Sequence, residues 1–195
     1  VGALSLDALS TGSWNTSVGY SSAGGMTTAN GVTAIGYSAL VANTASNNTA
    51  IGAFCADANS SATHLTAIGY SAGSSQAGAT DDNNTWVGYR AGKVANGSAS
   101  GLNTAVGSQS GKVISTGAGN TLVGASSGPS LTTGTDNTIL GRASGSTITT
   151  GISNTNIGSY TNYLGANVSR TVAVGVNALR DNSADDITAI GTDAL

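Results

Sequence analysis

The segment Asn137-Thr138-Ile139-Leu140-Gly141-Arg142-Ala143-Ser144-Gly145 recurs in degenerate form along the whole chain. Its glycine, Gly141, aligns with eleven others at spacings of 16 to 19 residues. These anchor glycines are Gly2, Gly19, Gly36, Gly52, Gly69, Gly88, Gly107, Gly124, Gly141, Gly158, Gly175 and Gly191. A period this constant is typical of solenoids, in which coils stack because no single coil can bury its own apolar face.

Composition indicates an ordered chain without long helices. Among 195 residues there are 29 glycines and one proline, and charged residues make up 8%. All nine acidic residues are aspartate, so straight-chain residues that favour helices are scarce and turn-forming residues abound. Such a composition without a period would indicate disorder, but every coil carries an aliphatic residue at one fixed place. We expect one repetitive solenoid domain over residues 1–195, as a fragment of a longer fibrous protein.

Charge and cysteine content exclude several classes of protein. The formal net charge is −3, and the six basic residues form no stripe that would hold nucleic acid. No apolar run approaches the roughly 18 residues of a membrane span, so we expect no membrane insertion. Cys55 is the only cysteine, which leaves no internal disulfide and no cysteine cluster for zinc. We predict no cofactor.

The residues before each anchor glycine predict a short strand; positions are counted from the anchor. Position −1 is aliphatic in all twelve coils, and position −3 is threonine in ten of eleven. Strand alternation places these two columns on one face, which we predict to be the core. Position −2 is rich in alanine and is predicted to point outward.

Other columns complete the predicted coil. Position +3 is always small, which indicates close packing, and position −4 is asparagine in seven coils. We predict that these amides form a ladder, each bonding the backbone of its own turn and of the adjacent coil. A second strand is predicted around apolar residues at position +7, which are Leu9, Met26, Ile114, Leu131 and Ile148.

Two short strands and two turns per coil describe a parallel β-roll or β-helix. We therefore predict an all-β solenoid of about twelve 16–19-residue coils, about 55 Å long. A monomer would expose the alanine-rich stripe, so we expect sister chains to cover it in a homotrimer, either intertwined or side by side. The alternative is a monomeric solenoid whose second sheet covers that face.

The repeat motif, seen as Asn48-Thr49-Ala50-Ile51-Gly52, resembles repeats of two known groups. One is the head domain of trimeric autotransporter adhesins, which are left-handed parallel β-rolls wound as trimers. The other is the shaft of phage tail fibres, where similar strings often precede a self-cleaving chaperone domain. Adhesin heads typically have shorter coils and read Ser-Val-Ala-Ile-Gly, so threonine at the valine place and the longer coil favour the fibre-like group.

Motifs that could carry chemistry have simpler explanations. The segment Gly124-Ala125-Ser126-Ser127-Gly128 matches the nucleophile-elbow pattern Gly-x-Ser-x-Gly, but its glycines are the anchor and the turn of a coil. The only histidine, His64, lies several coils away, so we predict no catalytic residue and no enzyme. Asp81-Asp82 and Asp185-Asp186 lack the regular spacing of calcium-binding repeats, and we predict no metal site.

An aromatic stripe is the predicted ligand-binding surface. Its residues are Tyr20, Tyr37, Tyr70, Trp86 and Tyr89, with the stripe broken at Ala53. Exposed rings can stack on sugar faces, whereas the competing interpretation is that they seal the interface between protomers. The two 19-residue coils add loops at residues 77–84 and 93–101, which we expect either to contact a partner or to be tolerated insertions.

These observations favour a non-enzymatic structural and adhesive fibre segment. The preferred interpretation is a phage tail-fibre shaft or receptor-binding region, outside the cell on the virion, that contacts a glycan or protein receptor of a host surface. The alternative is an adhesin head on a bacterial cell surface. A second alternative is an ice-binding solenoid, because position +8 is rich in hydroxyls, although the more regular threonine column is predicted to face inward.

Overall fold

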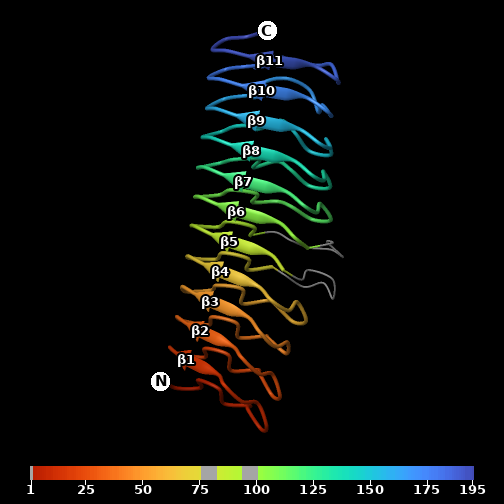
Figure 1. The fold of residues 1–195 in the computed structure, drawn as a ribbon. Helices are drawn as coiled ribbons and strands as arrows, with labels where there is room; N and C mark the ends of the chain where they lie inside the picture. Colours follow the sequence, from red (N-terminus) through yellow and green to blue (C-terminus); the bar gives the residue numbers. More distant parts are fainter. Residues whose placement is uncertain (1, 76–82, 94–100) are drawn as a thin grey trace.

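The computed structural model, described over residues 2–75, 83–93 and 101–195, is a parallel β-solenoid without helices in those ranges (Figure 1). Each described coil contributes one three-residue strand, and the strands stack in chain order into one sheet. The strands are β1 (Thr16–Val18), β2 (Thr33–Ile35), β3 (Thr49–Ile51), β4 (Thr66–Ile68), β5 (Thr85–Val87), β6 (Thr104–Val106), β7 (Thr121–Val123), β8 (Thr138–Leu140), β9 (Thr155–Ile157), β10 (Val172–Val174) and β11 (Thr188–Ile190).

The register of the sheet follows the anchor glycines. Between β2 and β3, Thr33 pairs with Thr49 and Ile35 with Ile51. Every two consecutive strands pair in this parallel register, including β4 with β5 and β5 with β6, which the two 19-residue coils connect. The predicted all-β solenoid and its period are therefore confirmed.

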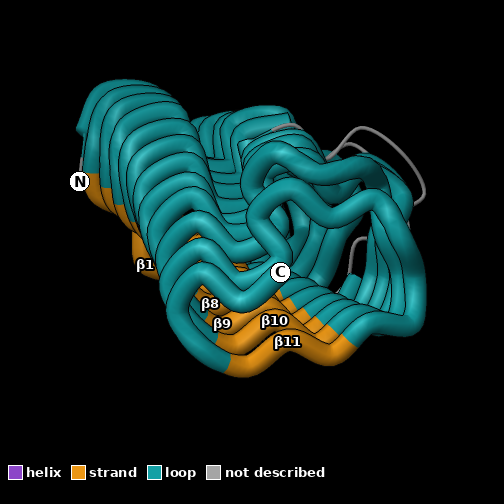
Figure 2. The backbone as a smooth tube through the Cα atoms, turned by 90° about the horizontal axis from the view of Figure 1, so that it is seen from above, coloured by secondary structure: helices purple, strands orange, loops and turns teal. Residues whose placement is uncertain are grey.

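The strands form only one wall of the coil, and turns form the rest (Figure 2). The second strand predicted around position +7 is wrong for the described residues, although Met26, Ile114 and Leu131 are buried there. Left-handed backbone conformations at positions +2, +4 and −5 interrupt any extended run, as at Ser126 with φ 53°. Backbone groups of these turns still bond the next coil, as in Gly128 N–H to the Ser144 carbonyl at 2.9 Å.

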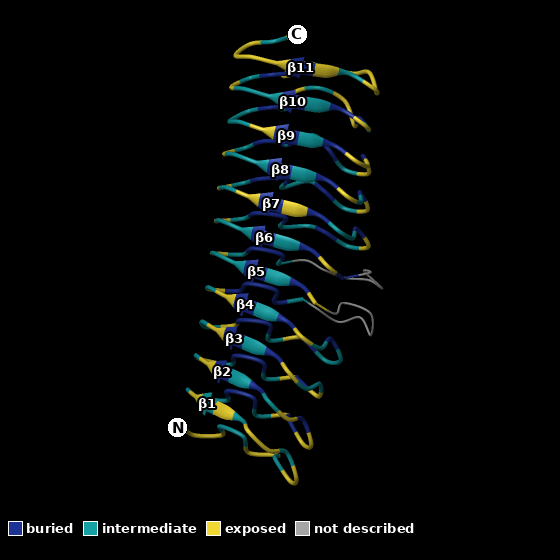
Figure 3. Ribbon diagram, viewed as in Figure 1, coloured by how far each residue is buried: buried dark blue, intermediate teal, exposed yellow. Residues whose placement is uncertain are grey.

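The direction of the strand side chains is the reverse of the prediction. Position −2 points into the coil, and Ala34, Trp86 and Ile139 are all fully buried. Positions −1 and −3 point outward, so each strand has one buried residue between two more exposed ones, except β1, which has no fully buried residue (Figure 3). The aliphatic column and the threonine column are therefore surface features.

The narrow interior explains this reversal. Positions −2 and +4 share the same space, because a Cβ added at Gly92 would lie 2.2 Å from the Trp86 ring, and one added at Gly145 would lie 2.8 Å from Ile139 Cδ1. Where position +4 is Leu40, position −2 is the small Ala34. In each coil, therefore, only one of positions −2 and +4 can carry a large side chain. The narrow interior has no room for the aliphatic column at position −1.

The predicted asparagine ladder is present. In the coils of β5 to β9 it consists of Asn84, Asn103, Asn120, Asn137 and Asn154, all buried. Asn120 Oδ1 accepts the Asn137 backbone N–H at 3.1 Å, and Asn137 Nδ2 donates to the Gly151 carbonyl at 2.8 Å. Asn137 therefore satisfies two backbone groups of the next coil, since its Oδ1 also accepts the Asn154 N–H, and its Nδ2 bonds the Asn120 amide oxygen of the coil before. Among the described residues, the ladder amides from Asn103 to Asn154 do not form the predicted bond to the backbone of their own turn.

The ladder and the apolar core both change character at β9. Asn156 takes position −2 and Asn162 takes position +4, and both are buried. The apolar core is split accordingly into one cluster that ends at Ile148 and a small one around Ala173, Leu179 and Ala189.

Candidate functional site

The largest candidate surface is the outer sheet face, which we define as the side chains at positions −3 and −1 of the strands β1 to β11. Its residues are Thr16, Val18, Thr33, Ile35, Thr49, Ile51, Thr66, Ile68, Thr85, Val87, Thr104, Val106, Thr121, Val123, Thr138, Leu140, Thr155, Ile157, Val172, Val174, Thr188 and Ile190. Parallel pairing sets the rungs about 4.8 Å apart along the rod.

The outer sheet face is neutral and markedly apolar. It holds no charged side chain, only threonine and branched aliphatic residues. Seven residues of the aliphatic column are at least 36% exposed, although neighbouring rungs shield one another. The solvated face of a sheet normally carries polar side chains, whereas at least half of this face is branched aliphatic.

An aromatic ladder runs along the first half of the rod, beside the carboxyl ends of the strands. It consists of Tyr20, Tyr37, Phe54, Tyr70 and Tyr89, with centroid distances of 5.4, 5.2, 5.9 and 5.8 Å between successive rings. Sequence reasoning missed Phe54 and placed a break at Ala53. The sequence does offer a signal, because Phe54 is the next residue along and lies in the coil after a 16-residue spacing.

The stacking of the aromatic ladder limits what it can bind. Tyr20 and Tyr37 are stacked at 13° and Tyr70 and Tyr89 at 17°, so these rings turn faces toward each other. Ring edges and hydroxyls are left to meet a ligand, which favours packing or hydrogen bonding over stacking on a sugar.

Trp86 does not belong to this surface. The prediction that it joins the aromatic stripe is wrong, because its side chain is fully buried against Gly92 inside the coil. Its indole N–H has no hydrogen-bond partner among the described residues.

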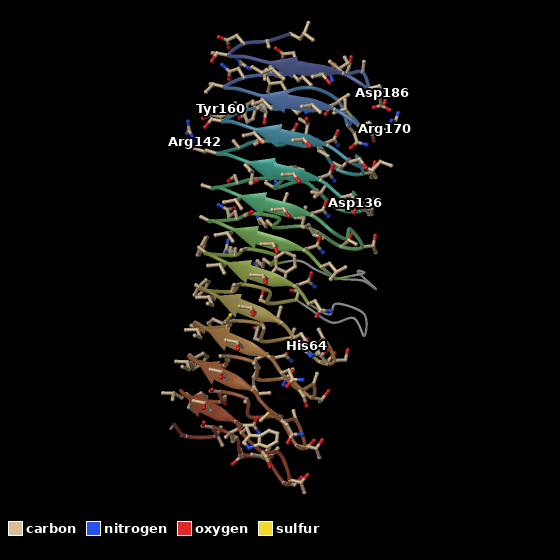
Figure 4. The ribbon with its side chains drawn as sticks, viewed as in Figure 1. His64, Asp136, Arg142, Tyr160, Arg170 and Asp186 are labelled. Carbon is tan, nitrogen blue, oxygen red and sulfur yellow. The ribbon has the colours of Figure 1, made fainter. Side chains whose placement is uncertain are left out.

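A second aromatic group lies in the last third of the rod and forms the tyrosine pocket. A cavity of about 160 Å³ is lined by Tyr160, Tyr163, Asn177 and Arg180. The two rings meet edge to face at 4.9 Å, and the Arg142 guanidinium lies 4.6 Å from the Tyr160 centroid. In Figure 4, Arg142 and Tyr160 project from the opposite side of the rod to Arg170 and Asp186.

The motifs weighed for chemistry do not assemble a reactive centre. Ser126 follows β7, whereas His64 precedes β4, three rungs away in the sheet. No group of three or more potential metal-ligating side chains occurs within the described ranges. Of the two aspartate pairs, Asp81-Asp82 lies outside the described residues.

Asp185 and Asp186 are occupied by neighbours. Arg170 Nε donates to Asp186 Oδ1 at 2.6 Å, and Asp185 Oδ1 accepts the Ser169 backbone N–H at 2.8 Å. The hydrogen bond from Arg170 lowers the pKa of the Asp186 carboxyl. The pair therefore acts as a link between coils at the edge of the rod.

Two further predictions concern loops and hydroxyls. Most of the loops at residues 77–84 and 93–101 lies outside the described residues. At position +8, hydroxyls donate to carbonyls of the next coil, as from Ser115 to Thr132 at 3.2 Å and from Thr132 to Thr149 at 3.0 Å. That column is therefore engaged by the backbone, whereas the threonine column at position −3 faces outward.

In the parts of the chain that the structure describes, no helix has the length and apolarity to cross a membrane. No family model, curated protein or solved structure matches this chain.

Proposed function

We propose that the chain is a structural and adhesive rod, a segment of a homotrimeric fibre such as the shaft or receptor-binding region of a phage tail fibre, and not an enzyme. It would lie outside the cell and present its sides to a glycan or protein receptor of a host surface. The observation that carries the proposal is the outer sheet face, which leaves a neutral apolar surface along every described strand.

Covering that face explains its composition. An uninterrupted ladder of aliphatic residues is a favourable surface to bury, and contiguous apolar patches of this kind mark interfaces. Because threonine, or valine in β10, and a branched aliphatic residue repeat in the same register on every described strand, a parallel copy meets similar residues along the sheet. The prediction that sister chains cover the alanine column is wrong, because that column is buried inside the coil. The interface that we propose is instead the outer sheet face, with a sister chain as its occupant.

A three-fold axis parallel to the rod suits the shape of the face. The face is only two side-chain columns wide, and three such strips can close around an axis while the three rods stay parallel. Two strips packed face to face are the competing arrangement, and the mass of the assembly separates the two.

Light scattering of the purified rod, before and after boiling, with far-UV circular dichroism, tests the proposal. We expect a heat-resistant particle of three times the 18.8 kDa chain mass with a strand signal. The matched variants are Ile51→Lys, on the outer sheet face, and Ile152→Lys, in an exposed turn. Only Ile51→Lys should dissociate the particle; a wild-type monomer would overturn the proposal.

The head of a bacterial surface adhesin is the alternative fibre. The same face and the same repeat support it. A membrane anchor encoded downstream would favour the adhesin, whereas a chaperone domain or a virion-attachment segment would favour the tail fibre.

Ice binding is a second candidate, and the outward threonine column favours it. A flat, regular array of hydroxyl and methyl groups about 4.8 Å apart is a surface that can order water. This candidate requires a monomer, because association would cover the array. Thermal hysteresis that is lost in Thr66→Tyr and kept in Thr28→Tyr, an exposed turn control, would establish it; a trimer without hysteresis would remove it.

A further inference from the structure

The tyrosine pocket combines three kinds of group around one cavity. Tyr160 and Tyr163 supply aromatic surface, Asn177 an amide, and Arg180 a guanidinium. The Arg180 side chain makes no hydrogen bond or ion pair with the described residues of the chain. The exposed guanidinium of Arg180 therefore lies beside two aromatic rings without a counter-charge from the described part of the chain. A ligand with an anionic group could supply that charge.

The two rings of the pocket meet edge to face, unlike the stacked tyrosine pairs of the aromatic ladder. Arg142 lies over one face of Tyr160. Both rings are only half-buried and both line the cavity, so part of their aromatic surface is left for a ligand. A pyranose ring offers apolar C–H groups to such a face and hydroxyls to a neighbouring amide.

The pocket is held by the backbone of two adjacent coils. The Arg180 carbonyl accepts the N–H groups of Leu164 and Gly165 at 2.8 and 3.0 Å, and the Asn177 N–H donates to the Ser159 carbonyl at 3.0 Å. Asn177 Nδ2 donates to Asp193 at 2.8 Å, which fixes the amide and leaves its oxygen available. None of these residues belongs to the outer sheet face.

Departures from the repeat cluster at the same level of the rod. Asn156, Asn162 and Val172 each replace the usual residue of their column, and all lie within the two coils that build the pocket. Positions where a chain breaks its own local rules are the places where function is expected.

We propose that the tyrosine pocket binds a carboxylated monosaccharide unit, with the carboxylate on Arg180, the ring against a free tyrosine face and a hydroxyl on Asn177. A guanidinium binds a carboxylate through two parallel hydrogen bonds. A cavity of about 160 Å³ is smaller than the roughly 300–1,000 Å³ of pockets for drug-sized ligands, and it suits one sugar unit at the end or side of a chain. The inference rests on the adhesive part of the proposed function, to which it adds a ligand class.

Titration of the 195-residue chain with glucuronate, glucose and acetate, followed by proton NMR of the tyrosine rings, tests the inference. We expect glucuronate to shift the Tyr160 and Tyr163 signals with an affinity at least tenfold above that of glucose or acetate. Arg180→Gln should abolish this preference, and Tyr163→Ala should weaken glucuronate at least tenfold. Arg90→Gln, which removes the guanidinium stacked on Tyr89 of the aromatic ladder, is the control and should change nothing.

Three results would overturn the inference. They are equal binding of acetate and glucuronate, no binding of glucuronate, and an equal loss in Arg90→Gln. None of them bears on the particle mass, so failure of the pocket is distinguishable from failure of the fibre.

Discussion

The coils that begin at β8 and β9 share one backbone but fill their interiors differently. In the first, Ile139 packs over Gly145 in the apolar core. In the second, Asn162 Nδ2 donates to Asn156 Oδ1 at 2.8 Å, while Asn156 Nδ2 and Asn162 Oδ1 have no partner in the described chain. The two coils therefore have the same shape, which the backbone ladders and anchor glycines set. We expect the side chains inside each coil to set its local stability.

Placing the polar filling in the apolar coil should have the largest effect. Ile139→Asn removes a fully buried aliphatic side chain and leaves a buried amide without partners, so we expect the free energy of unfolding to fall by about 4 kcal/mol. Urea denaturation measures this. Ile139→Val, which keeps the coil apolar, should cost about 1 kcal/mol; equal losses in the two variants would mean that the buried amide carries no penalty.

The shared backbone is tested at an anchor glycine. Gly141 has φ +134°, and a Cβ there would lie 2.2 Å from the Gly158 carbonyl oxygen. We expect Gly141→Ala to lower the free energy of unfolding by about 3 kcal/mol, from backbone strain and the clash together.

Gly191→Ala separates the two causes. Gly191 has φ +132°, but its nearest neighbour to an added Cβ is Ala194 Cβ at 3.9 Å. Only strain applies there, and a loss of about 1 kcal/mol is expected. A loss as large as that of Gly141→Ala would show that close coil contact is not what requires glycine.

Giving the β9 coil the filling of the β8 coil should stabilise it. Asn156→Ile combined with Asn162→Gly restores the Ile139–Gly145 pair one rung higher and removes both unpaired amide groups. We expect a gain of about 1–2 kcal/mol, seen as slower hydrogen exchange around β9 and β10. Asn156→Ile alone removes the acceptor of the Asn162 Nδ2 hydrogen bond, so it should add little to the free energy of unfolding. A double variant less stable than the native chain would contradict the idea that the polar interior weakens this coil.

Thiol probes compare how tightly the two regions exclude solvent. Cys55 and Thr161 both lie at position +3 and both are fully buried, the first in the apolar part and the second beside Asn162. In a Cys55→Ala background, Thr161→Cys should react with a thiol reagent at least about tenfold faster than Cys55 does in the native chain, because a less stable coil opens more often. Equal rates in the native state would show that both coils open alike.

A pH dependence of stability that is absent at neutral pH is expected from Cys55. Burial raises the pKa of its thiol from 9.0 to about 12. Above pH 9 the unfolded chain loses this proton and the folded chain keeps it, so stability falls as pH rises, by at most about 1.4 kcal/mol per pH unit up to pH 12. Cys55→Ala should remove this slope, because alanine has no proton to lose. The fold should tolerate the change, because alanine occupies the same position in neighbouring coils at Ala39 and Ala72.

Much of the fold followed from the sequence because the repeat is visible in it. The anchor glycines predicted every strand register, and the asparagine column predicted the ladder that the structure contains. The inward and outward faces were reversed because a strand of three residues, such as Thr-Ala-Ile, alternates equally well either way. The more apolar column was assigned to the core, although the narrow coil has no room for it.

A signal for the correct orientation was present in distant positions. Trp86 is followed six residues later by Gly92, and Ile139 by Gly145, whereas Ala34 is followed by Leu40. Such exchange of size shows that positions −2 and +4 compete for one space. The tyrosine pocket could not be predicted in this way, because Tyr160, Tyr163, Asn177 and Arg180 come from two coils and from columns that vary along the chain.

Hydrogen bonds between coils run along the rod, while the covalent chain winds around it. A pull on the two ends would therefore load the coils in series and open them one at a time from a terminus or from the weakest rung, rather than shear the sheet at once. The polar interior around β9 marks where such a rod would yield first, close to the C-terminal end. A fibre built this way would extend under load in steps of one coil and could reseal when the load is released.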